Sequence, residues 1–318
     1  MRYLNEFVLL KHFFGQFATG RYDLLPSLQG QAVTLAIDKQ VEGVWEYAGT
    51  KATQVVWTSN ADGVTLQTSL IPGSLALNST LNTHQHLVTL LQDTKRLLHH
   101  HLALWIGEQD HALTATDDQC VSELTLTLAR PMDLSYTNCS QNPLEPIESG
   151  FLTFSLNLTF PRFTSDHAQL LTWRQNYTRL QARLAYTHPV TAQTKTIVLP
   201  NLVLTNATAP TAGPGPRVLT VETQITQGKD VTTSATIAIS STGNTLTITA
   251  PGVFPYAAPG AQVTISGAAT PGNNGTFTVA SWTPTVLTLA TPPALVTEAA
   301  GATITVAVAN PPIYLLES

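Results

Sequence analysis

Histidines are the residues of this chain whose side chains are most obviously able to do chemistry. His99, His100 and His101 are consecutive, and His84 and His86 precede them. Imidazole is a common metal ligand, but neighbouring residues of a helix or strand point in different directions, so three consecutive histidines rarely bind one ion. No cysteine or carboxylate stands near them at the spacing of zinc ligands. We therefore predict a solvated or interfacial turn here rather than a metal site.

Carboxylates form a second group, with Asp117 and Asp118 in the polar segment 114–119 and Glu123 shortly after it. General acid–base catalysis needs two carboxyl groups in different environments that face one cleft, and a loop doublet is more often solvated. The chain has no G-x-S-x-G, P-loop or G-x-G-x-x-G motif, and Pro214 removes an N–H that a phosphate loop at Gly213–Gly215 would need. We assign no catalytic, cofactor-binding or metal-binding residue and expect a protein that is not an enzyme.

Tryptophans are the remaining candidates for ligand binding. Trp45, Trp57, Trp105 and Trp173 lie in stretches with an apolar pattern, which predicts core or interface positions. Trp282 lies near an expected loop and is the candidate for surface binding.

The elements that would position these residues are mostly strands, because apolar residues alternate with polar ones. In the first part we expect strands at 31–39, 54–58, 64–70, 102–106, 123–128, 151–160, 180–186 and 196–204. Two helices are expected, one after a cap at Thr83 and one from Ser165 to about Tyr177. The order strand, capped helix, strand thus occurs twice. It predicts an internal duplication, with units 1–136 and 137–225; a single larger β domain with two unrelated helices is the alternative.

The composition changes near residue 226. Of the 15 Lys and Arg residues, all but Lys229 precede this point, and a proline- and glycine-rich linker, 209–216, leads up to it. Beyond it, short alternating strands at 244–250, 261–266, 275–280, 286–290 and 302–307 predict a small all-β sandwich or barrel, residues 226–318.

Charged residues make up only 11% of the chain, against roughly 25% in an ordinary soluble protein. A surface this poor in charge is expected to be covered by neighbouring subunits. The net charge of −5 argues against a DNA-binding surface, and no apolar run is long enough to span a membrane. The apolar run in the first 20 residues is interrupted by Glu6 and Lys11, so we expect this segment to dock on a partner rather than to direct export; a buried N-terminal helix is the alternative.

Two stretches resemble proteins of long-tailed bacteriophages. The segment 195–215 (KTIVLPNLVLTNATAPTAGPG) looks like the closing strand and turn of tail tube proteins, and the segment 260–306 resembles the small Ig-like β modules appended to phage virion proteins. The resemblance implies tandem tail-tube-like β-sandwich units, each with a packed helix, followed by a C-terminal Ig-like module.

The same resemblance implies a function. Tail tube subunits form stacked rings whose sheets join into a barrel, through which DNA passes as transient, non-specific cargo. Two tube-like units per chain imply a trimeric, pseudo-hexameric ring, and one unit implies a hexamer. We expect a virion tail protein that is assembled in the host cytoplasm with other tail proteins and without membrane insertion. A baseplate or other tail ring component and a β-rich surface adhesin are the alternatives. If the C-terminal module only decorates the tube, deletion of Gln227–Ser318 should leave assembly largely intact.

Overall fold

The structure is a computed structural model of the 318-residue chain. It describes residues 13, 15–18, 21–24, 32–39, 43–77, 97–109, 113–133, 146–164, 167–188, 192–208, 218–226, 229–249, 252–255, 257, 259–290 and 295–317. The expected helix after Thr83, most of the N-terminal docking segment and the linker 209–216 lie outside these residues.

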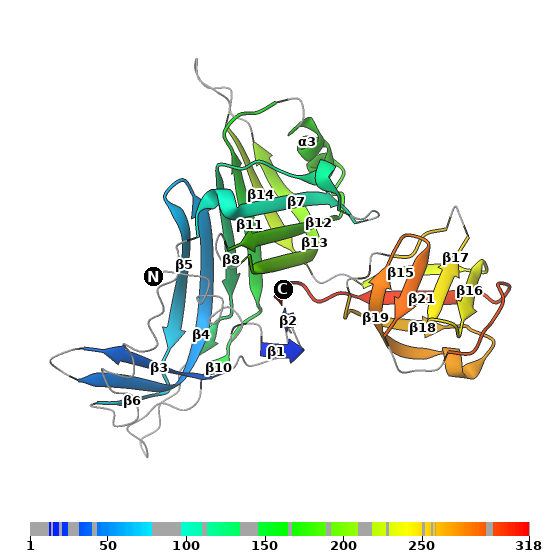
Figure 1. Cartoon of the computed structure of the whole chain (residues 1–318), viewed down its shortest axis with the longest axis horizontal. Coiled ribbons are helices and arrows are strands. Elements are labelled where there is room, and N and C mark those ends of the chain that lie inside the picture. Colours follow the sequence, from blue (N-terminus) through cyan, green and yellow to red (C-terminus); the bar gives the residue numbers. More distant parts are fainter. Residues whose placement is uncertain are drawn as a thin grey trace.

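The expectation of a mainly β fold is confirmed: 59% of the residues that the structure describes lie in strands, in several antiparallel sheets. The larger part, here called the body, is one extended sheet that folds into two layers (Figure 1). Its strands are β1 (Gly15–Ala18), β2 (Arg21–Leu24), β3 (Val33–Asp38), β4 (Val44–Asn60), β5 (Gly63–Ile71), β6 (Ser74–Ala76), β7 (Leu102–Glu108), β8 (Glu123–Ala129), β11 (Thr153–Phe160), β12 (Leu180–Thr187), β13 (Thr194–Thr208), β14 (Leu219–Ile225) and β22 (Tyr314–Glu317). The short hairpin β9 (Met132–Asp133) and β10 (Ile147–Glu148) forms a separate sheet.

Two long strands give the body its shape. The first half of β4 pairs with β3 and β6 in a three-stranded extension, here called the arm, and the second half pairs with β5 and β8. Gly49, with a φ of +64°, and a bulge between Ala52 and Gln54 mark the passage from arm to body. Strand β13 pairs with β12 and β22 in its first half and with β14 in its second half, so it belongs to both layers.

One hydrophobic core lies between the two layers. Leu124 faces Leu158 and Leu126 faces Leu156 across β8 and β11, and all four side chains are almost completely buried. Each such leucine stabilises the fold by about 1.5–3 kcal/mol relative to an exposed one. A slip of one residue would turn the intervening Thr and Asn side chains into the core, so the register is strongly specified.

This core changes the expected division of the first 225 residues. Trp57 and Leu126, from the expected first unit, belong to the same core as Leu158, Leu184 and Val221 from the expected second unit. Strand β8 also pairs along its whole length with β11. The described residues of 1–136 and 137–225 therefore form one body rather than two sandwiches in tandem, because neither set of strands encloses a core of its own.

The second expected helix is present but shorter than predicted. It is α3 (Ala168–Gln175), the α-helix among the described residues, and it buries Leu170 and Trp173 against β13. The indole Nε1 of Trp173 donates a hydrogen bond of 2.7 Å to Glu108 Oε1 at the end of β7. Among the described residues, no helix has the length and apolarity needed to cross a bilayer.

The C-terminal module is a small sandwich with its own core, as the alternating strands predicted. Its strands, in the spatial order β15-β21-β18-β19-β20-β17-β16, are β15 (Lys229–Ser234), β16 (Ile237–Ser240), β17 (Thr245–Ile248), β18 (Gln262–Ser266), β19 (Gly275–Trp282), β20 (Val286–Leu289) and β21 (Ile304–Ala309). Strand β19 pairs with β18 at its start and with β20 at its end, so it joins the two layers.

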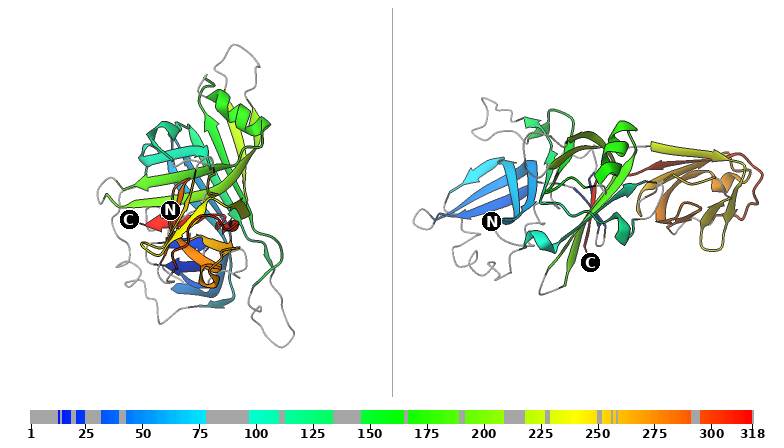
Figure 2. Two further views of the ribbon diagram at one scale, coloured as in Figure 1. Left: turned by 90° about the vertical axis from the view of Figure 1, so that its right-hand side faces the viewer. Right: turned by 90° about the horizontal axis from the view of Figure 1, so that it is seen from above.

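The chain does not end in the module. After β21 it returns to the body, where β22 pairs with β13 on one side and with β2 on the other. Figure 2 shows the module beyond one end of the body and the red C-terminal segment running back from it. The expected module of residues 226–318 is therefore an insertion between β14 and β22, and its last strand belongs to the body.

Candidate assembly surface

Strand β5 forms one edge of the body sheet and carries no charged residue and no proline in its nine residues, GVTLQTSLI. It pairs with β4 from Gly63, opposite Asn60, to Ile71, opposite Lys51. Among the described residues, no strand pairs with its other side. Natural proteins usually protect an exposed sheet edge with charges, prolines, bulges or short length, because unpaired N–H and C=O groups invite pairing with another chain. A long uncharged edge is therefore a surface for association.

The side chains of β5 follow the alternation of a half-buried strand. Leu66 is buried and Val64 packs against the body core, whereas Thr65, Gln67 and Ser69 are exposed. The exposed face of this edge is thus polar but uncharged, and like-charge repulsion would not oppose the approach of a second copy.

The other sheet edges are better protected. On β7, the backbone N–H of Gln119 donates to Leu104 O at 2.7 Å, which covers part of the edge. On β16, Ile239 exchanges two backbone hydrogen bonds of 2.9 Å with Glu298. Strands β1 and β6 have four and three residues, and β3 and β15 carry charged residues. Within the described part of the chain, β5 is the edge that most resembles a pairing surface.

The arm next to β5 exposes apolar side chains. Ile37, Leu75 and Leu77 are 37%, 47% and 58% exposed. The ammonium group of Lys39 lies 5.0 Å from the centroid of the Trp45 ring, so this half-buried tryptophan has a cation on one face. Exposed apolar residues on a projecting element are typical of a contact surface.

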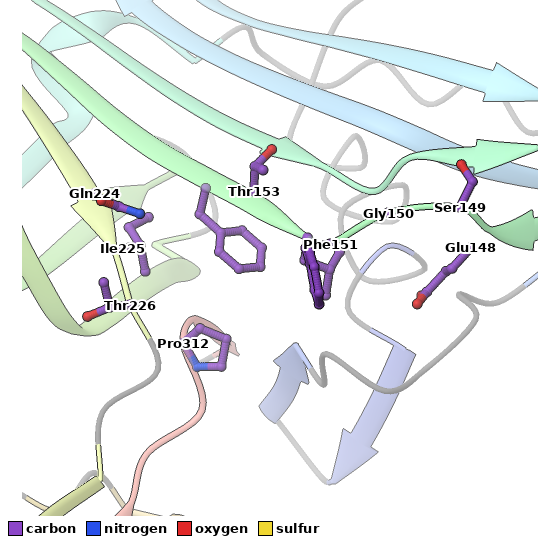
Figure 3. Close-up of a pocket in the computed structure, with 11 residues that line it drawn as sticks. Glu148, Ser149, Gly150, Phe151, Thr153, Gln224, Ile225, Thr226 and Pro312 are labelled. Atoms are coloured by element: carbon purple, nitrogen blue, oxygen red, sulfur yellow. The ribbon is translucent and has the colours of Figure 1, made fainter.

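A second apolar region surrounds Phe151, whose side chain is 93% exposed. It borders a hollow of about 750 Å³ between the start of β11, the end of β14 and the segment that returns from the module. Figure 3 shows Ile225 and Pro312 on one side of this hollow and Glu148 on the other. The lining combines these apolar side chains with the polar side chains of Glu148, Ser149, Thr153, Gln224 and Thr226.

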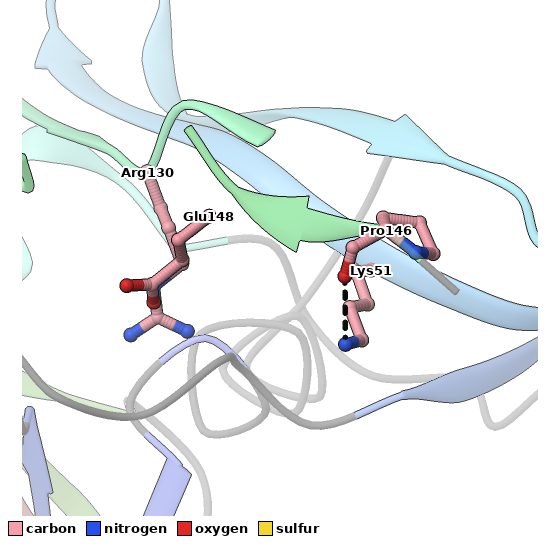
Figure 4. Close-up of polar contacts among 4 residues, drawn as sticks. All are labelled: Lys51, Arg130, Pro146 and Glu148. Carbon is pink, nitrogen blue, oxygen red and sulfur yellow. Dashed lines mark hydrogen bonds and ion pairs between the residues drawn. The ribbon is translucent and has the colours of Figure 1, made fainter. Parts of the chain in front are cut away.

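Two buried cations lie behind the β9–β10 hairpin (Figure 4). Lys51 is 1% exposed, and its Nζ donates a hydrogen bond of 3.0 Å to Pro146 O. Arg130 is completely buried, and its Nε lies 3.3 Å from Glu148 Oε1, close enough for an ion pair but without hydrogen-bond geometry. Burial lowers the pKa of Arg130, and the negative charge of Glu148 partly offsets this effect. The ring of Phe13, 5.0 Å from the guanidinium carbon, is its other close partner.

The histidine run forms a turn, as predicted. His99–His101 is a single 3-10 turn that leads into β7, and the described residues contain no group of three metal ligands. Burial and the neighbouring His100 and His188 lower the pKa of His101. His84 and His86 lie outside the described residues.

His99 also belongs to a polar chain that sequence reasoning missed. Trp57 Nε1 donates a hydrogen bond of 2.8 Å to Tyr186 Oη, and Tyr186 also forms a hydrogen bond with Ser59. Ser59 Oγ lies 2.8 Å from His99 Nδ1. On the other side of the imidazole ring, His99 Nε2 lies 2.8 Å from Val121 O. If His99 carries its proton on Nε2, Ser59 donates to Nδ1 and His99 donates to Val121 O. Ser59 is completely buried, so its hydroxyl serves to join the two layers, whereas His99 is half-buried.

The three carboxylates do not share a cleft. Asp117 accepts hydrogen bonds from the backbone and hydroxyl of Thr114, Asp118 forms a backbone bridge to Trp105, and Glu123 is exposed at the start of β8.

The four tryptophans that were expected in the core or at an interface are either buried or half-buried. Trp57 and Trp173 are buried, Trp45 and Trp105 are half-buried, and Trp282 borders a hollow of about 370 Å³ where the module meets the body.

Compared with protein-family models and with curated proteins, the sequence matches none.

Proposed function

We propose that this chain is a structural protein that assembles with copies of itself by pairing at the outer edge of β5, and that the assembly is the stacked-ring tail tube of a long-tailed bacteriophage. The observation that carries the proposal is the uncharged nine-residue edge of β5. At about 3.4 Å per residue, this edge offers roughly 30 Å of backbone for pairing with a neighbour. Closure of the ring would satisfy these groups, because a closed barrel has no edge.

The low charge of the chain supports an extensive interface. Only 11% of residues are charged, and obligate subunit interfaces are apolar and bury on the order of 2,000 Å² or more. The exposed apolar residues of the arm would add to such a contact, either with a neighbour in the ring or with the next ring.

The single body core favours six chains per ring over three. A trimer with pseudo-sixfold symmetry requires two tube-like units in each chain, whereas the described residues of 1–225 share one core. The position of the module is compatible with a ring, because the module and β5 lie on opposite sides of the body in Figure 1. The module can then project from the ring without obstructing the paired edges.

The test is a pair of charged substitutions on β5. Thr65→Lys with Gln67→Lys should leave the fold intact, since both side chains are exposed, but should prevent rings or tubes in negative-stain electron microscopy. The control is Val231→Lys with Thr233→Lys, at the same spacing on the exposed face of module strand β15. The proposal fails if the β5 variant assembles like the unaltered chain. It also fails if the unaltered chain remains monomeric at high concentration with a preformed seed.

A surface adhesin is the second candidate, favoured by the hollow beside Trp282. Binding of a glycan by the monomer, with no assembly under any condition, would support that function. A single ring without stacking would instead indicate a baseplate or other tail ring component.

A further inference from the structure

The last strand of the chain holds together three parts of the molecule. In β22, Leu315 lies opposite Ile197 of β13 on one side and Tyr22 of β2 on the other. Strand β2 pairs with β1 to form the N-terminal hairpin, and among the described residues no other strand pairs with this hairpin. Residues 21–23 and 314–316, far apart in sequence, thus meet in one sheet.

The two faces of β22 belong to different cores. Ile313 and Leu315 are completely buried in the body core, whereas Tyr314 is 3% exposed and belongs to the core of the module. Leu316 packs against the module core as well. A strand buried on both faces loses both sets of contacts if it leaves its place, so this short strand fixes the module and the hairpin to the body.

We propose that the place between β13 and β2 is a strand-acceptor site for the segment Ile313–Leu316 of the same chain, and that its insertion is what fixes the N-terminal hairpin and the module to the body. The hairpin and β22 are almost 300 residues apart in sequence, so this part of the sheet closes only when the segment after the module has been made. The acceptor requires an extended segment with large apolar side chains on both faces, which Ile313–Leu316 supplies. The inference does not depend on the proposed tail tube function.

Hydrogen exchange of the full-length chain, read by mass spectrometry, tests the proposal. Leu315→Ala should raise exchange of the β1 and β2 amides together with those of β22, by roughly tenfold or more, because these strands would open as one unit. Leu126→Ala serves as the matched control, since Leu126 is 1% exposed in the same body core but lies on β8, away from the acceptor site. This control should lower global stability without selectively opening the hairpin.

A second control addresses the module. Leu289→Ala removes a side chain that is 2% exposed in the module core and should raise exchange within the module only. The proposal is overturned if Leu315→Ala leaves hairpin exchange unchanged. It is equally overturned if Leu126→Ala raises hairpin exchange as much as Leu315→Ala does, because the hairpin would then open only with the whole body.

Discussion

The buried ion pair between Arg130 and Glu148 gives the sharpest prediction on stability. Of two substitutions at this one contact, one should lower the free energy of unfolding and the other should leave it unchanged or raise it. Glu148→Gln removes the negative charge and leaves the guanidinium buried. Arg130→Met removes the positive charge and fills the same space with an apolar side chain. Glu148 keeps 23% of its side-chain surface exposed, so its carboxylate can turn toward water when Arg130 is absent.

The magnitudes follow from burial. Breaking a buried pair by removal of one partner typically costs about 3–5 kcal/mol, and partial exposure of Glu148 reduces this to about 2–3 kcal/mol for Glu148→Gln. Nη1 and Nη2 of Arg130 have no hydrogen-bond partner within the described residues, so their desolvation is not compensated there. Replacement of a whole buried ion pair by apolar side chains of similar volume is often neutral or stabilising by about 1–4 kcal/mol, and Arg130→Met approaches this case because the remaining Glu148 is partly exposed. We therefore expect Arg130→Met to be neutral or stabilising.

Urea unfolding followed by tryptophan fluorescence measures both effects, since Trp57 and Trp173 are buried in the body. The double variant is the control. With Arg130→Met already present, Glu148→Gln should lower the free energy of unfolding only slightly, because there is no longer a buried guanidinium to be left without a partner. If Arg130→Met destabilises the body as much as Glu148→Gln does, the contacts of the guanidinium, including that with the Phe13 ring, outweigh its desolvation and the reasoning is refuted.

Three further outcomes are expected. Tyr186→Phe removes the hydroxyl that links the two layers and should cost about 1–3 kcal/mol in denaturant unfolding, whereas no change would mean that the polar chain is unimportant. Burial alone would raise the pKa of Glu298, but hydrogen bonds from two backbone amides and one side-chain amide of residues 269–273 outweigh it and lower the pKa. These hydrogen bonds to the Glu298 carboxylate therefore stabilise the module fully at a pH above the ordinary pKa of the carboxyl, and their contribution is lost as the pH falls through the lowered pKa. The melting temperature of the module, measured against pH, should show this dependence, and Glu298→Gln should abolish it. Gly267→Ala should destabilise the module more than Gly243→Ala, since both have positive φ but a Cβ at 267 would collide with Thr303 O; equal melting temperatures would contradict this.

The strands that could be predicted from sequence are those with strict alternation. The segment Glu123–Leu128 buries one face, and the period of two reports this directly. Thr196–Leu204 was also expected as a strand, but it is buried on both faces of β13. The pattern could not show that β8 pairs with β11 across the expected boundary between two units, because alternation gives the buried face of a strand but not its neighbour. A duplicated order of elements was therefore compatible with two sandwiches or with one.

The sequence could predict that the protein has a surface for association, but not which strand provides it. The low charge indicated extensive burial against other copies, and the absence of charge in Gly63–Ile71 is visible in the sequence. That β5 forms an edge, whereas the similar segment Glu123–Leu128 is central, depends on the order of strands in the sheet. The polar chain through Ser59 and His99 was missed because its members are far apart in sequence and each is an ordinary core or turn residue alone.

Strand β22 was missed for a different reason, and its position changes how the module can be removed. Tyr314–Glu317 is too short to show alternation, and it follows two prolines that suggest the end of structure. Deletion of Gln227–Ser318, which should leave the body intact if the module only decorates it, would also remove this strand and expose β13. Thr226 and Pro312 border the same hollow, so a short glycine linker can join them and omit the module while β22 stays in the sheet. Such a chain separates the two roles: loss of assembly with the linker would implicate the module itself, whereas loss only after the full deletion would implicate the strand.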